Sequence, residues 1–378
     1  MTTRRRAIAA LAALVAATLI VRTVPSWWCG RGAADWLRGD VAPQRALADE
    51  LIRFEARDDA RASAPPADRF AGEWALVTHQ MTALGLAQVA LAHPELRGAY
   101  VPVITRAATK SFAPEMRDFG TRAWRGEDAL AALEGPHGHA YLAYAALALG
   151  VARGMDPAFP AELAARHDAL IAAYERRLLA SPTGLIETYP NEAYPTDVAA
   201  VAAAIAAHGR ATGADHRAAL AHWAAKVRAV QIDPKSGLVI QRMGADDGAP
   251  HDAPRASGTG LAAYFAGFAD RALAKELAAG ALRQERTLLG FGAIAEYAPG
   301  HDGAGDIDSG PVVLGVSVSA TGFALAPARA FGEGDAFARL YRTTSLFGVP
   351  SGGRFATGGP IGNALLLALL TSGPELAP

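Results

Sequence analysis

The chain has 378 residues, of which 51% are hydrophobic and 19% charged, and its formal net charge at pH 7 is −1. Its basic residues are scattered along the chain, which excludes the clustered positive charge of a nucleic-acid-binding protein. The single cysteine, Cys29, excludes an internal disulfide and a cysteine-based zinc site.

The N-terminal segment has the pattern of an export or anchoring signal. Three arginines at positions 4–6 precede the uncharged apolar run 7–21. With Arg22 snorkelling, residues 7–28 are long enough to cross a bilayer, and no small-residue cleavage site follows. We expect residues 1–28 to be an uncleaved signal anchor in the inner membrane, single-pass, with the main domain on the periplasmic side. A cleaved signal and a secreted protein are the alternative.

The remainder is expected to be a helical spacer and linker over 29–68, followed by one large domain over 69–378. The spacer would contain a charged amphipathic helix over 42–60 and a short linker at 63–67. The main domain begins with four predicted helices at Glu73–Ala92, Glu95–Phe112, His139–Val151 and Pro160–Leu179.

A repeated unit then follows, in which a glycine, a brief extended segment and a polar loop lead into a helix of small residues. The repeat is roughly 50 residues long, which is typical of stacked supersecondary units. The helices that close the units are predicted at Val198–Gly209, Gly258–Phe268, Val312–Ala328 and Ala364–Leu370. With the earlier hairpins, these units predict an all-α fold, an (α/α)6 toroid whose polar loops meet at one mouth.

The loop 184–197 carries the densest set of polar groups at that mouth and runs directly into the apolar helix from Val198. Its candidate residues are Glu187, Tyr189, Asn191, Glu192, Tyr194 and Asp197.

Two carboxylates in this loop are expected to divide into an acid and a base. Glu187 follows the apolar Leu185-Ile186, so we expect it to be desolvated and to act as the proton donor. Asp197 stands in the first turn of a helix, where the dipole favours its ionised form as a fixed anion or base. The alternatives are a capping role for Asp197 and a salt bridge from Glu187 to Arg255 or Arg354.

Other loops contribute further candidates. His139 opens a helix and would be a general base near neutral pH, or else pack at the helix start. Asp308 is interpreted as a further carboxylate at a helix mouth, and it would orient substrate together with Asp197. Neither the 306–308 segment nor the histidines at 137 and 139 has metal-ligand spacing, so we expect no metal at the mouth. The remaining expected substrate-binding residues are Trp74, His79, Trp124, Arg255 and Tyr264, and core packing is the alternative for Trp74, Trp124 and Tyr264.

Several strings, taken in order, resemble the linalool dehydratase/isomerase-like family. They are Gly85–Arg97, Gly138-His139 opening a helix, Gly184–Glu187 running to Asp197, Asp233–Gly237 and Asp306–Gly310. The resemblance implies a six-hairpin α/α toroid that performs acid/base chemistry on a small apolar alcohol, without organic cofactor or metal. It also places the family's catalytic histidine on His139.

The sequence departs from the family at other active-site positions. The two active-site cysteines of the family fall on Glu187 and Thr196, so both thiols are missing. The family draws an aspartate and a tyrosine from a neighbouring subunit, which implies a homo-oligomer. Those residues would precede Trp74, where this chain offers Asp68 and no tyrosine.

Three hypotheses about function follow. The first is a dehydratase or isomerase of an apolar alcohol, with His139 and Glu187 as the proton-transfer pair, which requires a largely apolar cavity. The second is a glycoside hydrolase or lyase that uses two carboxylates, with aromatic side chains stacking on sugar rings. The third is a non-catalytic module of the cell envelope, in which arginines neutralise the carboxylates at the mouth.

Overall fold

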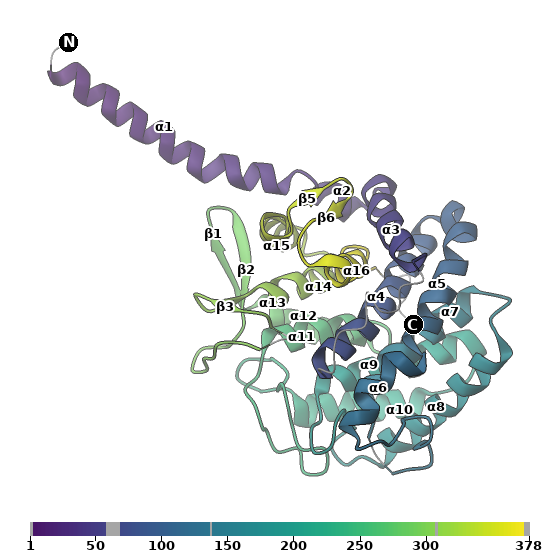
Figure 1. The fold of residues 1–378 in the computed structure, drawn as a ribbon. Coiled ribbons are helices and arrows are strands. Elements are labelled where there is room, and N and C mark those ends of the chain that lie inside the picture. The colour runs from purple at the N-terminus through teal and green to yellow at the C-terminus, as the bar shows by residue number, and fades with distance from the viewer. Residues whose placement is uncertain (1–2, 58–68, 137, 307–308, 374–378) are drawn as a thin grey trace.

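The computed structural model describes residues 3–57, 69–136, 138–306 and 309–373, and it is mostly helical, as the sequence predicts. A long N-terminal helix projects from a rounded helical body (Figure 1). Single turns of 3-10 or π geometry occupy Pro94–Leu96, Ala140–Leu142 and Val227–Gln231. The α-helices are α1 (Thr3–Gly30), α2 (Ala33–Arg38), α3 (Val41–Glu55), α4 (Arg69–Ala92), α5 (Arg97–Ser111), α6 (Pro114–Ala123), α7 (Ala143–Met155), α8 (Ala161–Ala180), α9 (Pro195–Thr212), α10 (Arg217–Lys226), α11 (Ala256–Ala266), α12 (Arg271–Leu282), α13 (Val318–Phe323), α14 (Leu325–Ala330), α15 (Gly334–Gly348) and α16 (Gly359–Leu370).

Two small antiparallel sheets interrupt the helices in the C-terminal third. One has the order β1-β2-β4-β3 and the other pairs β5 with β6. The strands are β1 (Glu285–Leu288), β2 (Phe291–Ala295), β3 (Val312–Val313), β4 (Val316–Ser317), β5 (Pro350–Ser351) and β6 (Arg354–Phe355).

The helix predicted over Val312–Ala328 therefore begins six residues late, and this part of the all-α prediction is wrong. Leu314 and Gly315 both have positive φ, of 53° and 80°, and they form the turn between β3 and β4. Ser317 then caps α13, because its hydroxyl accepts a hydrogen bond from the Ala320 N–H. This left-handed turn joins β3 to β4, and the resulting hairpin occupies the residues at which the helix was predicted to begin.

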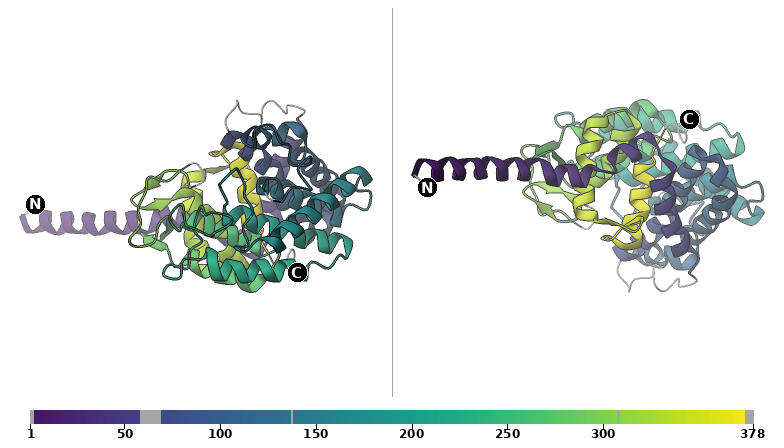
Figure 2. Two further views of the ribbon diagram at one scale, coloured as in Figure 1. Left: turned by 90° about the horizontal axis from the view of Figure 1, so that it is seen from below. Right: turned by 90° about the horizontal axis from the view of Figure 1, so that it is seen from above.

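The helices rich in small residues pack in sequence. Helix α4 packs on α7, α7 on α9, α9 on α11, α11 on α13 and α14, these two on α16, and α16 returns to α4. Six further helices, α5, α8, α10, α12, α15 and α3, each pack on one or two of these helices, which are the more deeply buried set and are called the inner helices below. Figure 2 shows the helical body from below and from above, with the N-terminal helix projecting from it in both views.

Glycine and alanine allow the inner helices to approach closely. A Cβ atom added at Gly150 of α7 would lie 2.9 Å from the Cβ of Ala207 in α9. One added at Gly85 of α4 would lie 2.8 Å from Cγ of Leu367 in α16. Residues 195–208 of α9 are all buried, which agrees with the apolar character predicted for this helix.

Helix α3 falls in the segment predicted as a spacer, and it packs on α4, α5 and α16. Leu47 and Leu51 are buried against the body. At its end the buried Glu55 accepts a 2.6 Å hydrogen bond from Nδ1 of His79 on α4. This contact gives His79 a structural role outside the pocket described below.

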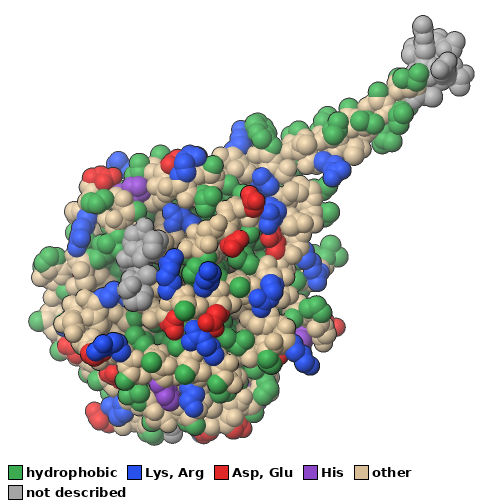
Figure 3. Space-filling view, turned by 180° about the vertical axis from the view of Figure 1, so that it is seen from behind, with side chains coloured by type: hydrophobic (Ala, Val, Ile, Leu, Met, Phe, Trp, Pro, Cys, Tyr) green, Lys and Arg blue, Asp and Glu red, His purple; other side chains and the backbone are tan. Residues whose placement is uncertain are grey.

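Helix α1 is apolar and exposed over residues 8–25, and Figure 3 shows apolar side chains on it where it leaves the body. Two helices among the described residues are long and apolar enough to cross a membrane, α1 and α4. Helix α4 is buried in the body and is a core helix. The apolar N-terminal helix that the sequence predicts is therefore present, at the edge of the folded body.

Candidate active site

A pocket lies at one end of the inner helices, where the loop 184–197 meets α9. Side chains from α4, α7, α9, α11, α13 and α16 all reach it. Its walls are largely apolar, with a small set of carboxyl, hydroxyl and amide groups among them. The lining residues are Glu73, Trp74, Val77, Met81, Tyr144, Tyr189, Tyr194, Thr196, Asp197, Gln241, Ser257, Gly258, Leu261, Phe323 and Leu365.

Asp197 is the buried carboxyl group of this pocket. Tyr144 donates a 2.6 Å hydrogen bond to its Oδ1, and Thr188 donates one of 2.6 Å to its Oδ2. Burial raises the pKa of Asp197, and the two hydroxyl hydrogen bonds oppose that shift without cancelling it. Desolvation at this buried position therefore acts against the ionised form that the helix dipole was expected to favour.

Glu187 has a different environment from the one predicted. It is half-buried, and its Oε1 accepts a 2.9 Å hydrogen bond from the backbone N–H of Asn191. Asn191 is exposed and has φ of 65°, so Glu187 stabilises a tight left-handed turn between Tyr189 and Glu192. Of the two carboxyl groups, Asp197 and not Glu187 is the desolvated one. Glu187 and Asn191 are both outside the set that lines the pocket.

His139 is fully buried, but it lies beside the pocket rather than in its wall. Its Nε2 pairs with Oε1 of Glu127 at 2.9 Å, and its ring stacks on Trp124 at 4.4 Å between centroids. Burial lowers the pKa of His139, with Glu127 acting in the opposite direction. The ring of Tyr141 lies 6.1 Å from His139 and 6.1 Å from Tyr189, between the histidine and the pocket.

Tyr189 and Tyr194 do line the pocket, as the sequence predicts. Tyr189 donates a 2.6 Å hydrogen bond to Oε2 of Glu73, at the start of α4. Tyr194 donates one of 2.9 Å to Oε2 of Glu192. Glu73 is therefore a second pocket carboxylate, and the sequence analysis missed it because only the tertiary contact with Tyr189 identifies it.

Gln241 is another pocket residue that the sequence analysis missed. Its side chain is 6% exposed, and its Oε1 has no hydrogen-bond partner among the described residues. Gly258 approaches it so closely that an added Cβ would lie 2.5 Å from that oxygen. The carbonyl of Gly258 also accepts a 3.1 Å hydrogen bond from Thr196, which ties the start of α9 to the start of α11. An acceptor buried without a partner is suited to binding a ligand hydroxyl.

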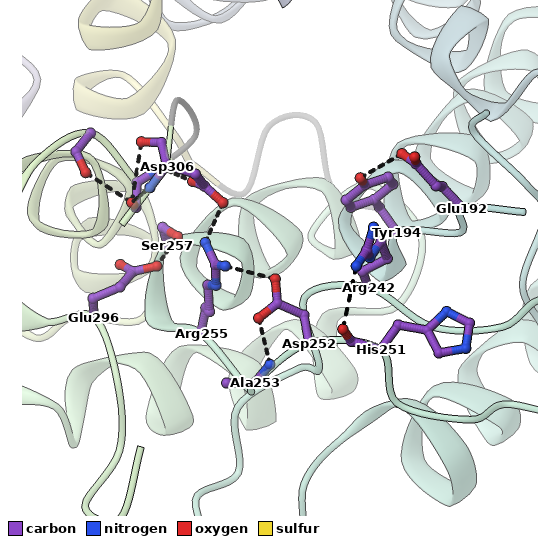
Figure 4. A network of polar contacts seen from close by, with 12 residues as sticks. Glu192, Tyr194, Arg242, His251, Asp252, Ala253, Arg255, Ser257, Glu296 and Asp306 are labelled. Carbon is purple, nitrogen blue, oxygen red and sulfur yellow. Dashed lines mark hydrogen bonds and ion pairs between the residues drawn. The ribbon is translucent and has the colours of Figure 1, made fainter. Parts of the chain in front are cut away.

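A polar network centred on Arg255 lies beside the pocket (Figure 4). Arg255 is buried and forms ion pairs with Asp252, at 2.7 Å, and with Asp306. Glu296 is fully buried, and its Oε1 accepts a 2.5 Å hydrogen bond from the pocket residue Ser257. Burial raises the pKa of Glu296, while Ser257 and Arg255 oppose the shift. The network thus places a second desolvated carboxyl directly behind the pocket wall.

The other predicted site residues have mixed outcomes. Trp74 lines the pocket, whereas Trp124 packs on His139 and donates a 3.0 Å hydrogen bond to the carbonyl of Thr188. Tyr264 is buried elsewhere and accepts a 3.2 Å hydrogen bond from Gln88. Asp308 lies outside the described residues.

The described part of the chain contains one group of three histidine or acidic side chains that is close enough to hold a metal ion. It consists of His167, Asp168 and His208, and none of the three lines the pocket. No family model matches the chain, and a search of curated proteins also gives no match.

Proposed function

We propose that the protein is an enzyme that removes water from, or isomerises, a small and largely apolar alcohol by acid/base catalysis without a cofactor. The observation that carries this proposal is the buried carboxyl of Asp197 in a mostly apolar pocket, with its pKa raised by burial. A carboxyl group whose pKa is raised by burial is better suited to donate a proton than an exposed one, which fits the role of a general acid. The resemblance to linalool dehydratase/isomerase-like proteins points to the same reaction class.

In the proposed reaction, Asp197 protonates the substrate hydroxyl, the C–O bond breaks and water leaves. The substrate hydroxyl is first oriented by donating its own hydrogen bond to Oε1 of Gln241, an atom without a partner in the part of the chain that the structure describes. Glu73, the second pocket carboxylate, takes the allylic proton, and the C–H electron pair forms the new double bond. Asp197 ends deprotonated and Glu73 protonated, so proton exchange with solvent restores the starting state.

The walls of the pocket support an apolar substrate. Trp74, Met81 and Phe323 line the pocket together with the polar groups, and an aromatic face beside the reacting carbon would stabilise positive charge that develops there. An apolar groove adjoins the pocket and shares Trp74, Phe323 and Leu365 with it. The groove continues along α16 and α15, which offers an apolar substrate a route towards Asp197.

We also propose that the inner helices form the closed ring of an (α/α)6 toroid. The order of packing supports this, because α16 returns to α4 and each inner helix has an outer partner. In this arrangement α3 is the outer partner of α16, and its segment belongs to the catalytic domain. The pocket receives side chains from α4, α7, α9, α11, α13 and α16, as the mouth of such a ring would.

Helix α1 is proposed to anchor the enzyme in the inner membrane, with the body on the periplasmic side. Its exposed apolar surface and the arginines at positions 4–6 support this placement. At the body end of α1, the β1–β2 turn approaches it, since a Cβ at Gly290 would lie 3.2 Å from the Cβ of Ser26. The neighbouring Leu288 and Leu289 are 74% and 42% exposed, which suits a membrane surface. A secreted protein is the alternative if the segment is cleaved.

The second candidate function is a glycoside hydrolase or lyase. Two carboxyl groups, Glu73 and Asp197, line one pocket together with Trp74, Tyr189 and Tyr194, and this combination also occurs where enzymes hold sugar rings. The largely apolar lining of the pocket favours the alcohol over a sugar, because a sugar needs polar partners for its many hydroxyl groups.

The experiment that separates the two is a substrate screen on the full-length protein in mild detergent. Linalool and related alkenols form one panel, with products followed by gas chromatography. Oligosaccharides form the other, with new reducing ends or unsaturated products measured. Alkene formation supports the proposal, cleavage of a sugar supports the second candidate, and inactivity on both panels favours a non-catalytic module of the cell envelope.

A further inference from the structure

A cluster of histidines lies at the opposite end of α9 from the pocket. His167 and Asp168 are on α8, and His208 is near the end of α9. One potential ligand atom from each of the three lies within 4.8 Å of the other two. His208 is eleven residues after Asp197 on one helix, so the cluster is about 17 Å from the pocket carboxyl along the helix axis.

His167 is the most unusual member of the cluster. It is fully buried, and neither ring nitrogen has a hydrogen-bond partner among the described residues. The ring of His208 lies against it, with 5.2 Å between centroids. The backbone carbonyl of Ala146 is close enough to affect the ring, but no hydrogen bond of normal geometry forms. Burying an imidazole without hydrogen-bond partners lowers the free energy of unfolding, and binding of a metal ion by the ring nitrogen would offset that loss.

The second observation is a chain of hydrogen bonds that orients His208. Glu175 accepts a 3.0 Å hydrogen bond from Nδ1 of His216, and Nε2 of His216 is 2.9 Å from Nδ1 of His208. With neutral rings, His216 therefore accepts at Nε2, His208 donates from Nδ1, and Nε2 of His208 keeps its lone pair. This lone pair faces Oδ1 of Asp168 at 2.8 Å. Two acceptors so close together require a proton or a metal ion to bridge them.

We propose that His167, Asp168 and His208 bind one divalent transition-metal ion of the zinc type. Two imidazoles and one carboxylate are a donor set that suits Zn²⁺ and is too rich in nitrogen for Ca²⁺ or Mg²⁺. A carboxylate–histidine relay behind a ligating histidine, such as Glu175–His216, is a common support for such a site. Asp168 has 49% of its side chain exposed, so a water molecule can complete a tetrahedral shell from the solvent side.

Binding requires only a local contraction. Ligand atoms around tetrahedral zinc are separated by about 3.4 Å, so the most distant pair in the cluster closes by roughly 1.4 Å. The half-exposed Asp168 side chain is free to rotate towards the buried His167 and so supply part of this movement. Arg153 opposes it, because its guanidinium already forms an ion pair with the same carboxylate. The metal and Arg153 therefore compete for Asp168.

The test uses full-length protein in detergent after treatment with a chelator. Zn²⁺ is titrated by calorimetry, and Co²⁺ is added separately to record its d–d absorption, which reports on ligand type and geometry. We expect one ion per chain, with the Co²⁺ spectrum of a four-coordinate nitrogen and oxygen site. His216→Gln should weaken Zn²⁺ binding by about 10–100-fold, and Asp168→Asn and His208→Gln by at least as much. Arg153→Met should tighten it, which a merely structural cluster would not do.

The matched control is His251→Gln, which removes an exposed loop histidine outside the cluster. Its titration should equal that of the wild type. The proposal is overturned if the wild type binds no ion, or if folded Asp168→Asn and His208→Gln proteins bind Zn²⁺ as the wild type does. Circular dichroism establishes that each variant is folded, and the half-exposed Asp168 is the ligand whose replacement disturbs packing least.

Discussion

The hydroxyl of Tyr144 on α7 donates a 2.6 Å hydrogen bond to the carboxyl of Asp197 on α9. These two helices pack along their length, so the acid in the pocket is held by a residue 53 positions earlier in the chain. Thr188 holds the other carboxyl oxygen. Both partners are neutral hydroxyl groups, so neither adds the positive charge with which an arginine would favour the ionised form of Asp197.

Replacement of Tyr144 by phenylalanine is expected to raise the pKa of Asp197 further. The hydrogen bond from Tyr144 stabilises the ionised carboxyl, so its loss raises the pKa. The same loss should lower the free energy of unfolding at neutral pH by about 1–3 kcal/mol. Urea unfolding measures the loss, and Thr188→Val should show the same direction. An unchanged stability for both variants would contradict the described environment of Asp197.

The stability that Asp197 and Glu296 contribute should fall as pH rises above about 4, the unfolded pKa of aspartic acid. Burial raises the pKa of both Asp197 and Glu296, so the folded state holds more protons than the unfolded state up to their folded pKa values. Each group then lowers the free energy of unfolding by up to about 1.4 kcal/mol per pH unit within that window. Urea unfolding between pH 5 and 8 should show a smaller slope for Asp197→Asn than for the wild type. The exposed Asp302→Asn variant is the control and should keep the wild-type slope.

Helix α7 offers a matched pair of glycine substitutions. Gly150→Ala should destabilise the protein by about 1–3 kcal/mol, because the new methyl group would meet Ala207 at 2.9 Å. Gly154→Ala is the control, since its Cβ would lie at an ordinary 3.7 Å from Ala211 and the helix gains about 0.5–1 kcal/mol in propensity. Thermal unfolding distinguishes the two. Equal effects would contradict the close crossing of α7 and α9.

Deletion from the N-terminus should separate the anchor from the folded body. A fragment that starts at residue 31 lacks α1 and is expected to be soluble and folded. A fragment that starts at residue 58 also lacks α2 and α3. It exposes the apolar surface against which Leu47 and Leu51 pack, and it leaves His79 without Glu55. We expect this shorter fragment to aggregate, as measured by size-exclusion chromatography and circular dichroism. A well-folded shorter fragment would show that α3 is dispensable.

The helical character of the chain and the position of the polar loop were predictable from the sequence. Alanine-rich segments without β-branched runs predict helices, and the helix predicted from Val198 is present as α9, which starts three residues earlier with Pro195 in its first turn. The β3–β4 turn was not predictable from composition, because the stretch from Val312 is as apolar as a buried helix. Only the left-handed backbone at Leu314 and Gly315 distinguishes it.

The chemistry of the site was only partly predictable, because burial depends on distant parts of the chain. Sequence neighbours suggested that Glu187 would be desolvated, but Tyr144 and the packing of α7 on α9 bury Asp197 instead. Glu73 and Gln241 join the pocket from segments far from loop 184–197. The buried position of His167 likewise follows from helix packing, and no local motif marks it.

Replacement of Gln241 by leucine tests how the proposed enzyme orients its substrate. The change removes the acceptor for the substrate hydroxyl and nearly preserves side-chain volume. Loss of one such hydrogen bond should raise KM by roughly 5–30-fold, equivalent to about 1–2 kcal/mol, with a smaller effect on kcat. A variant with wild-type KM would remove Gln241 from the proposed mechanism.

The most direct test of the account is the yield of alkene from the alkenol panel by wild-type protein and by the Asp197→Asn variant. The asparagine keeps the shape of the side chain but has no acidic proton, so we expect alkene formation by the wild type and a loss of about 100-fold or more in the variant. The exposed Asp302→Asn protein should retain wild-type activity. Alkene formation at the wild-type rate by a folded Asp197→Asn protein would contradict the central claim that Asp197 is the catalytic acid.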